Sequence, residues 1–365
     1  MSKSQKIDRV FLISVLLLTV AGFFIFTSAS LGLLARDGVT FGSVALRQTI
    51  GLIIGAGGFF IMSRTQYRNL RKYAFYIFVF SIIINLLLFV PAFRIDHGGA
   101  SRWIDLRFIT FQPSEFLKIA FIIYFAAWLS GTREKTSGLI MGVLPYLVIV
   151  GILGLLLYKQ SDLDTLVVIA STGIVMLFAS GARKRDLLII GIILILAVSA
   201  YAYIQPYARQ RIMTFLNPSL NPQGAAYQIQ QSLISIGSGK WTGRGFGQSI
   251  QKFNYLPEPI GDSIFAVGAE EFGFIGSVGL IVLFLLFLFR SIKIAVRAQD
   301  SFGGLIVIGI AILVMIESFM NISSMLGIIP LSGMPLLFVS QGGTALIIIL
   351  TATGIIANVS KYQKL

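Results

Sequence analysis

Ten apolar segments of bilayer-crossing length dominate this sequence and restrict what it can fold into. They cover residues 10–34, 45–63, 73–93, 113–129, 138–158, 163–181, 186–204, 272–290, 302–323 and 343–360. The hydrocarbon core of a bilayer is about 30 Å thick, so a crossing helix needs about 20 predominantly apolar residues. With 56% hydrophobic and 12% charged residues, the composition excludes a large soluble core. We expect an all-α polytopic membrane protein with about ten transmembrane helices, folded as a single domain over residues 1–365.

The first apolar segment follows Lys3, Lys6 and Arg9 and is too long for the core of a signal peptide, so we interpret it as an uncleaved anchor. The sequence has no cysteine, which excludes disulfides and thiolate metal sites. His97 is the single histidine, so a histidine metal cluster is excluded as well.

Basic residues gather in alternate loops, and this pattern sets the orientation. Of the 29 lysines and arginines, 17 lie in the two terminal segments and four short loops: Lys3, Lys6, Arg9, Arg64, Arg68, Arg71, Lys72, Arg133, Lys135, Arg183, Lys184, Arg185, Arg290, Lys293, Arg297, Lys361 and Lys364. With ten spans all of these fall on one side, which the positive-inside rule assigns to the cytoplasm. The same rule accounts for the formal charge of +14, so we expect no nucleic-acid partner.

The acidic residues show the opposite bias. Of the 15 acids, those on the cytoplasmic side would be Asp8, Glu134, Asp186 and Asp300. The remaining acids lie outside or within the membrane, which indicates that function resides on the outer face.

Three long connections form that outer face, over residues 94–112, 205–271 and 324–342. The second, between spans 7 and 8, is far longer than an ordinary connection, and loops of that length are usually functional. The third is uncharged and rich in glycine and proline, which predicts a re-entrant loop between spans 9 and 10.

Asp262, at the end of the second connection, is the main candidate for chemistry. It follows Pro257, Pro259 and Gly261, which favour bent, non-helical backbone, and it precedes an apolar segment. A carboxylate in such a position is costly and therefore indicates function. The alternative is an aspartate that only caps a turn. We interpret Asp262 as a catalytic base at the outer surface.

Glu115 and Lys118 stand at the start of the fourth span, in the segment Phe111-Gln-Pro-Ser-Glu-Phe-Leu-Lys118. Residues three apart lie on one face of a helix, which places Lys118 about one turn deeper. A buried structural ion pair and a contact between Lys118 and a diphosphate are both consistent with this spacing. Glu317, inside the ninth span, is another intramembrane acid whose partner the sequence does not identify.

Other polar motifs have simpler explanations. Glu270 and Glu271 would stabilise the N-terminus of the eighth span. Asp162-Leu-Asp164 spells the D-x-D of metal-dependent sugar transferases, but two acids at this spacing recur by chance, and helix capping explains at least one of them.

The long outer connection is also rich in glycine and basic residues. Its glycines at 237, 239, 243, 245 and 247 do not match a dinucleotide fingerprint and predict either a close-packed loop or backbone contact with a ligand. Its basic residues would face either lipid headgroups or an anionic substrate: Arg209, Arg211, Lys240, Arg244 and Lys252.

These motifs, taken in order, resemble the SEDS family (shape, elongation, division and sporulation) over nearly the whole chain. The resemblance rests on Ala100-Ser-Arg-Trp-Ile104, Phe111-Gln-Pro-Ser-Glu115 with Lys118, Gln160-Ser-Asp-Leu-Asp-Thr165, Arg209, Gly224-Ala-Ala-Tyr-Gln228, Ile236-Gly-Ser-Gly239, Leu256-Pro-Glu258, Asp262, Glu270-Glu-Phe-Gly273, Asn321, Gly333-Met-Pro-Leu336 and Ser340-Gln-Gly-Gly343. Ser161, Asp164 and Gln341 depart from the usual family pattern. The segment Gln251–Glu258 is more similar to the division type, FtsW, than to the elongation type, RodA.

The resemblance implies a peptidoglycan glycosyltransferase at the outer face of the cytoplasmic membrane that joins two lipid II molecules with inversion. It implies Asp262 as general base and substrate contacts by Arg102, Trp103, Glu115, Lys118, Arg209, Arg211, Lys252, Glu258, Ser340, Gly342 and Gly343. A class B penicillin-binding transpeptidase and other division proteins, at the division septum, are the implied partners. Participation of a divalent cation, Mg²⁺ or Mn²⁺, is left open.

The residues are consistent with this chemistry on their own terms. A sugar hydroxyl needs a positioned base, whereas a diphosphate leaves readily and needs cationic stabilisation more than a general acid. Three alternatives remain: a lipid II flippase, an elongation-type polymerase and a non-catalytic division scaffold. A flippase would use the intramembrane charges but should show paired broken helices, and the sequence shows one broken segment, 327–343.

The orientation can be tested directly, because the chain contains no cysteine. Single cysteines in place of Ser219, in the long connection, and Ser137, in a short basic loop, would be treated with a membrane-impermeant maleimide on intact cells. We expect labelling at position 219 and protection at position 137. The reverse pattern would overturn the orientation and the outer active site with it.

Overall fold

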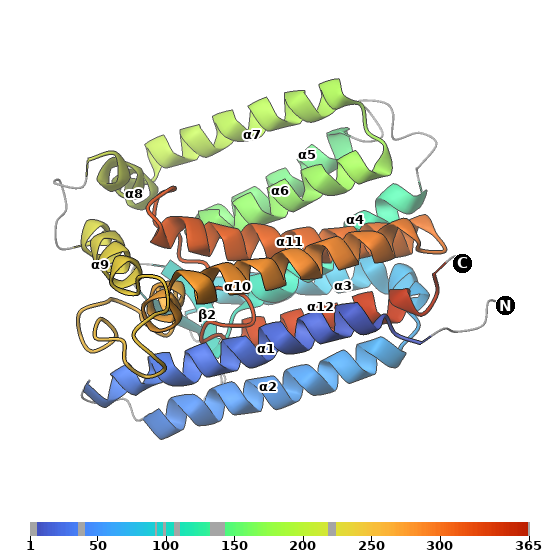
Figure 1. Ribbon diagram of the computed structural model, residues 1–365. Helices are drawn as coiled ribbons and strands as arrows, with labels where there is room; N and C mark the ends of the chain where they lie inside the picture. Colours follow the sequence, from blue (N-terminus) through green and yellow to red (C-terminus); the bar gives the residue numbers. More distant parts are fainter. Residues whose placement is uncertain are drawn as a thin grey trace.

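The computed structural model describes residues 6–35, 41–91, 93–97, 100–105, 110–131, 143–217 and 224–363. Long helices run side by side along one axis and form a bundle (Figure 1). They are α1 (Arg9–Ser30), α2 (Phe41–Arg64), α3 (Arg68–Leu86), α4 (Pro113–Gly131), α5 (Leu144–Lys159), α6 (Leu163–Ser180), α7 (Lys184–Ile204), α10 (Ile264–Val296), α11 (Ser301–Met325) and α12 (Gly343–Ser360).

Within these ranges, nine helices are long and apolar enough to cross a membrane, and α5 is a shorter apolar helix of 16 residues. Each of them coincides with one of the ten apolar segments, so the prediction of a polytopic helical membrane protein is confirmed. The first part of the predicted span 138–158 lies outside the described residues. Arg133 and Lys135, which contributed to the predicted orientation, also lie outside the described residues.

The two ends of the described chain lie at the same end of the bundle (Figure 1). The Asp8 backbone N–H donates to Ser360 Oγ at 3.1 Å, and Arg290 forms an ion pair with Asp8 at 2.7 Å. This pairing is consistent with an even number of spans. The long connection between α7 and α10 lies at the opposite end (Figure 1).

The helices differ in how deeply they lie in the bundle. In α11 and α12, 72% and 78% of the most apolar stretch is buried, whereas in α7 the share is 11%. The central helices therefore pack mainly against protein, and α7 contacts the rest of the bundle along little of its length.

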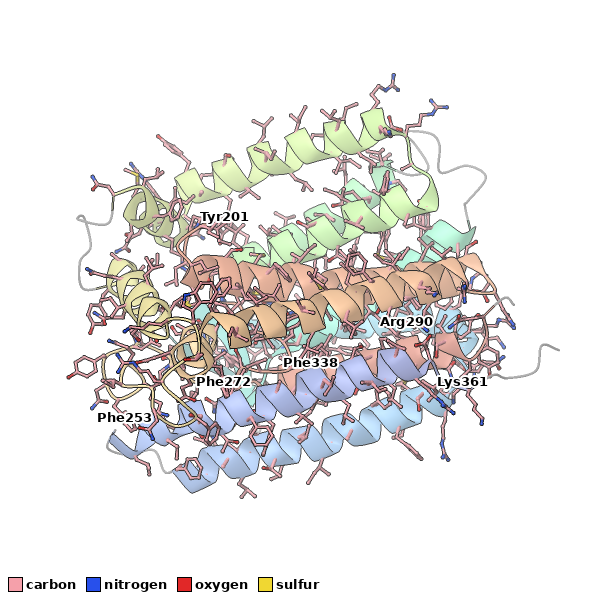
Figure 2. All side chains as sticks on the ribbon, viewed as in Figure 1. Tyr201, Phe253, Phe272, Arg290, Phe338 and Lys361 are labelled. Carbon is pink, nitrogen blue, oxygen red and sulfur yellow. The ribbon has the colours of Figure 1, made fainter. Side chains whose placement is uncertain are left out.

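The segment 326–342 between α11 and α12 is non-helical and confirms the predicted re-entrant loop. Its residues Leu336, Leu337, Phe338 and Val339 are buried, and the Phe338 ring contacts two rings of α10. Figure 2 places Phe338 between α1 and α10. Non-helical backbone survives at membrane depth only when protein surrounds it, as it does here.

The first outer connection contains strands that the all-α prediction did not include. Strands β1 (Arg94–His97), β2 (Ala100–Asp105) and β3 (Thr110–Phe111) form an antiparallel sheet in the order β1-β2-β3. The strands are too short to give a clear alternating pattern in the sequence. The sheet carries Arg102 and Trp103 toward the bundle.

The long outer connection begins with two helices that lie across the bundle axis (Figure 1). They are α8 (Pro206–Leu216) and α9 (Ala225–Ser238). An irregular loop over 239–263 then leads to α10.

Helix α10 is broken at Gly273, and the glycine-rich loop fills the break. Gly273 has φ 67° and ψ −165°, so backbone groups on either side of it lose their helical partners. The N–H groups of Arg244 and Gly245 donate to the carbonyls of Glu270 and Glu271, each at 3.0 Å. On the other side, the N–H groups of residues 274 and 275 donate to the carbonyls of residues 240 and 241.

This arrangement corrects the predicted role of Glu270 and Glu271. Helix α10 begins at Ile264, so these acids lie about two turns into it and do not stabilise its N-terminus. Glu270 accepts hydrogen bonds from the loop at Ser249 Oγ (2.6 Å) and at the Ile250 N–H (3.1 Å). The acids therefore hold the glycine-rich loop in place. The loop is close-packed, which is one of the two interpretations that the sequence allowed.

Gly243 is the position where this packing is tightest. It has φ +81°, and a Cβ added there would overlap the Glu271 carbonyl oxygen. We expect Gly243→Ala to destabilise the protein by about 1–3 kcal/mol, the usual cost of a left-handed backbone in a non-glycine residue, with the overlap adding to it. Thermal unfolding in detergent measures this loss. Gly237→Ala is the matched control, because its added Cβ meets nothing within 4 Å. Equal unfolding temperatures for the two variants would contradict the close packing of Gly243 against Glu271.

Candidate active site

A polar cavity of about 390 Å³ opens at the end of the bundle opposite the termini, where four parts of the sequence meet. Its lining comes from α2, the small sheet, the turn before α10 and the start of α12: Arg47, Gln48, Gly51, Trp103, Thr110, Glu258, Gly261, Asp262, Gln341, Gly342, Gly343 and Ile347. The structure thus brings together five of the residues singled out from the sequence, namely Trp103, Glu258, Asp262, Gly342 and Gly343.

Asp262 lies on a tight turn immediately before α10. The N–H groups of Gly261 and Ser263 both donate to the Glu258 carbonyl at 3.1 Å, and Glu258 has a positive φ of 46°. The two prolines and Gly261 explain why the sequence bends here instead of starting the helix earlier. The turn leaves the Asp262 side chain half-buried at the wall of the cavity.

Two buried side chains hold this turn against the re-entrant segment. Asn321 of α11 donates to the Asp262 carbonyl at 2.7 Å and to the Met334 carbonyl at 2.8 Å. Ser340 Oγ donates to the Gly261 carbonyl at 2.8 Å and accepts from the Leu336 N–H at 2.9 Å. Ser340 was predicted to contact substrate; its position shows that its hydroxyl supports the turn.

The surroundings of Asp262 shift its pKa upward. Burial makes the largest contribution, and the nearby Glu258 and Asp164 carboxylates raise the pKa further, while Arg211 and Arg102 lower it. The resulting pKa of Asp262 is about 7, against an ordinary value of 3.8. A carboxylate with a pKa near neutrality is well matched to accept and release a proton.

Two arginines approach the same point from other elements. Arg211 of α8 pairs with Asp164 of α6 at 3.0 Å, and Asp164 also accepts from the Gly333 N–H at 3.2 Å. A Cβ placed on Gly333 would lie 3.5 Å from Arg211 Nη2, 3.7 Å from Asp262 Oδ2 and 3.9 Å from Arg102 Nη1. The absent side chain of Gly333 therefore leaves a space bordered by one carboxylate and two guanidinium groups.

The arginines also line a second cavity of about 220 Å³, with Asp164 and Tyr201. This cavity shares lining residues with an apolar cavity of about 590 Å³ between α5, α6 and α7, among them Leu163, Val167 and Tyr201. A cationic pocket that continues into an apolar one at membrane depth suits an amphiphile with an anionic head and a long hydrocarbon tail.

Three predicted diphosphate contacts lie away from these cavities. Lys118 is fully buried between Glu115 (2.8 Å) and Glu317 (2.6 Å), which identifies the partner of Glu317. The structure therefore matches the buried ion pair, one of the two interpretations of Glu115 and Lys118, and does not place Lys118 at the cavity.

Lys252 and Arg209 also lie away from these cavities, one buried and the other exposed. Lys252 is buried and donates to Glu271 (2.8 Å), the Gly247 carbonyl (2.9 Å) and Ser28 (3.1 Å), so its ammonium group has no hydrogen left for a ligand. Arg209 is exposed on α8 with its guanidinium 5.8 Å from the centre of the Tyr203 ring. The predicted substrate contacts of Lys252 and Arg209 do not agree with these positions.

The D-x-D acids have structural partners. Asp162 caps α6, accepting from the Thr165 N–H at 3.4 Å and from Thr165 Oγ1 at 2.9 Å, and it lies 3.7 Å from Arg102. Arg102 also donates to the Ser161 carbonyl. In the part of the chain that the structure describes, no group of three or more acidic, cysteine or histidine side chains is arranged to hold a metal ion.

Five residues that line the polar cavity were not identified from the sequence: Arg47, Gln48, Gly51, Thr110 and Ile347. Arg47 carried a usable signal, because it is a charged residue just inside an apolar segment. The others have no distinguishing pattern and reach the cavity through the packing of α2, β3 and α12.

Comparison with known proteins agrees with this geometry. The family model described as "Cell cycle protein", which groups FtsW, RodA and SpoVE, matches residues 8–365. The chain is 36% identical over 367 residues to a probable peptidoglycan glycosyltransferase FtsW of Geobacter sp. (strain M18), covering 100% of this chain and 99% of that protein. It is 37% identical over 320 residues to the stage V sporulation protein E of Bacillus subtilis (strain 168), covering 88% and 87%.

Two solved structures share the fold. A chain from a peptidoglycan synthase complex, described for its coordination of polymerization and crosslinking, superposes with a TM-score of 0.78 at 26% identity, covering 98% of this chain and 99% of that chain. The rod shape determining protein RodA of Thermus thermophilus superposes with a TM-score of 0.70 at 26% identity, covering 98% of each chain. The chain therefore belongs to the FtsW, RodA and SpoVE family of cell cycle proteins.

Proposed function

We propose that this chain is a peptidoglycan glycosyltransferase that polymerises lipid II at the outer face of the cytoplasmic membrane, with Asp262 as the general base. The observation that carries the proposal is the meeting of the Asp262 carboxylate with Arg102 and Arg211 around Gly333. A base and two cations around one open space are the groups that glycosyl transfer from a diphosphate requires.

In the reaction, the Asp262 carboxylate accepts the proton of the acceptor sugar's 4-hydroxyl. The freed oxygen electron pair attacks the anomeric carbon of the donor glycan opposite the diphosphate, the bond to the diphosphate oxygen breaks, and that oxygen leaves with its electron pair. Direct displacement inverts the anomeric configuration. Asp262 then releases its proton to water, which its pKa of about 7 allows at neutral pH.

The two cavities suggest separate places for the two substrates. Asp262 lines the polar cavity of about 390 Å³, where the acceptor hydroxyl must reach it beside Trp103 and Glu258. Arg102 and Arg211 line the second cavity and would hold the donor diphosphate as its negative charge increases in the transition state. The donor's hydrocarbon tail would occupy the apolar cavity between α5, α6 and α7.

A divalent cation, if Mg²⁺ or Mn²⁺ assists, would add positive charge at the diphosphate. Glu258 and Asp262 are the carboxylates in the polar cavity, and two acids are fewer than a dedicated protein cage provides. We assign no step to such an ion. The roles above rest on Asp262 and the two arginines.

We further propose a role in cell division, at the septum, with both termini in the cytoplasm. Several full-length relatives carry the name FtsW, and a structural neighbour comes from a complex that both polymerises and crosslinks. A class B transpeptidase is accordingly the partner we propose.

Asp262→Asn tests the catalytic role. Asparagine is nearly isosteric but cannot act as the base, so we expect a loss of about 10²–10⁴-fold in polymerisation rate with folding retained. The measurement is glycan formation from labelled lipid II by the purified protein, with and without the transpeptidase. The wild-type rate should rise as pH increases through about 7, because only the deprotonated Asp262 accepts a proton.

The matched controls are Glu270→Gln and Glu258→Gln. Glu270 is a buried acid that serves the loop and not the cavity, so its variant tests general damage near α10. Glu258→Gln should lower the midpoint of the pH profile, since the Glu258 carboxylate raises the pKa of Asp262. Wild-type polymerisation by Asp262→Asn would end the proposal.

Lys118 is expected to act through stability. Its ammonium group neutralises part of the charge of Glu115 and Glu317, and removing one partner of a buried ion pair costs about 3–5 kcal/mol. Lys118→Met should therefore yield little folded protein, and the triple variant that adds Glu115→Gln and Glu317→Gln should restore folding and activity. Chromatographic monodispersity and polymerisation rate measure both. A well-folded but inactive Lys118→Met variant would return Lys118 to the substrate site.

A further inference from the structure

Arg47 is a cation in the lining of the polar cavity, and the roles described above leave it unused. Among the described residues that line this cavity, the other charged side chains are the acids Glu258 and Asp262. Arg47 lies six residues after the first residue of α2, about 9 Å along the helix axis. Helix α2 begins at the end of the bundle opposite the termini (Figure 1), so Arg47 lies in the same half of the bundle as Asp262.

The helix that carries Arg47 faces lipid along most of its length. In its most apolar stretch 22% of the residues are buried, and Leu46 and Ile53 are 60% and 66% exposed. A guanidinium group on such a helix is costly unless it reaches an anion or the headgroup region. Arg47 is itself exposed, so it lies where the polar cavity meets the surrounding lipid.

Arg47 differs in its partners from the two arginines assigned to the donor. Arg102 lies 3.7 Å from Asp162, and Arg211 pairs with Asp164 at 3.0 Å. In the described part of the chain, no acidic side chain forms an ion pair with Arg47. Its charge is therefore available to an anion that comes from outside the protein.

Hydrogen bonds fix the place of Arg47 relative to Asp262. The neighbouring Gln48 donates to the Ser340 carbonyl at 3.4 Å, and Ser340 Oγ donates to the Gly261 carbonyl at 2.8 Å. These contacts link the first turns of α2 to the turn that carries Asp262. The cation and the carboxylate therefore lie on two walls of one cavity.

We propose that Arg47 binds the diphosphate of the acceptor lipid II, an assignment that rests on the polymerase function proposed above. That reaction brings two lipid-linked diphosphates to one protein, and the donor's is assigned to Arg102 and Arg211 in the second cavity. Arginine is suited to the acceptor's diphosphate because its planar guanidinium group donates two parallel hydrogen bonds to phosphate oxygens. The acceptor's hydrocarbon tail then lies in the bilayer beside α2, and its sugars extend through the polar cavity to Asp262.

The reaction changes the two diphosphates differently, which gives Arg47 a kinetic signature. The donor's diphosphate gains negative charge in the transition state, so a cation that holds it increases kcat. The acceptor's diphosphate keeps its charge throughout the step. A cation that holds it stabilises the bound substrate and the transition state equally, and it therefore lowers KM without changing kcat.

Arg47→Gln tests this signature in polymerisation assays with labelled lipid II. We expect KM for lipid II to rise about 10-fold to 100-fold, the effect of losing a charge-assisted hydrogen bond, with kcat retained. Arg47→Lys keeps the charge and should recover most of the affinity. Arg64→Gln is the matched control, because Arg64 is an exposed arginine at the other end of α2, with its guanidinium 4.0 Å from the centre of the Phe60 ring.

A binding measurement separates the substrate from bulk lipid and needs no turnover. Full-length Asp262→Asn is titrated with lipid II in detergent, with and without dioleoylphosphatidylglycerol, and native mass spectrometry counts the bound molecules. We expect two lipid II molecules per protein. Adding Arg47→Gln should weaken the binding of one of them by about tenfold or more, whereas adding Arg64→Gln should change neither. Phosphatidylglycerol should not displace the lipid II that depends on Arg47.

Two results would overturn the proposal. One is unchanged binding of both lipid II molecules by a monodisperse Arg47→Gln variant. The other is loss of bound phosphatidylglycerol alone from that variant, which would make Arg47 an anchor for bilayer headgroups. Polymerisation by Asp262→Asn would instead contradict the proposed general base, and it would leave the dependence of lipid II binding on Arg47 intact.

Discussion

The break in α10 at Gly273 is the constraint on which the outer half of this molecule depends. Within hydrocarbon every backbone N–H and C=O needs an internal partner, so a broken helix survives only where other backbone replaces the lost bonds. The loop over 240–245 supplies these partners on both sides of the break. As a result, the loop and the first turns of α10 form one unit, and Asp262 stands at the start of that helix.

Buried charged side chains also need internal partners. This requirement distinguishes the side chains with a structural role from Asp262. Lys118 lies between Glu115 and Glu317, and Lys252 pairs with Glu271, so each of these lysines has a carboxylate partner inside the bundle. Asp262 differs, because its carboxylate faces a cavity and its pKa is raised to about 7 by burial and neighbouring acids. A protein keeps such a costly group where chemistry needs it.

The turn that carries Asp262 is held from several directions. Asn321 ties it to α11 and to Met334, and Ser340 ties it to the re-entrant segment. The Gln341 N–H donates to the Ile260 carbonyl at 2.7 Å, which links the turn to the chain entering α12. These contacts explain why a re-entrant segment without a charged residue belongs to the site: its backbone groups at Met334 and Gln341, together with the Ser340 hydroxyl, determine where Asp262 lies.

The sequence by itself determined the spans, the long outer connection, the re-entrant segment and the prominence of Asp262. Each follows from a local rule, because bilayer thickness sets helix length and a carboxylate beside an apolar helix is costly wherever it occurs. Local rules failed for Lys252 and for Glu270 and Glu271. Their partners come from distant elements: Lys252 bonds Ser28, 224 residues away.

Only the tertiary structure decided which cations reach Asp262. Arg102 and Arg211 come from a strand and a helix on different outer connections and meet Asp262 around Gly333. In the sequence, neither charge nor spacing distinguishes these two arginines from Arg209 and Lys252. Their selection depends on how α6, α8 and the small sheet pack, because a side chain's partners are set by three-dimensional neighbours and not by its position along the chain.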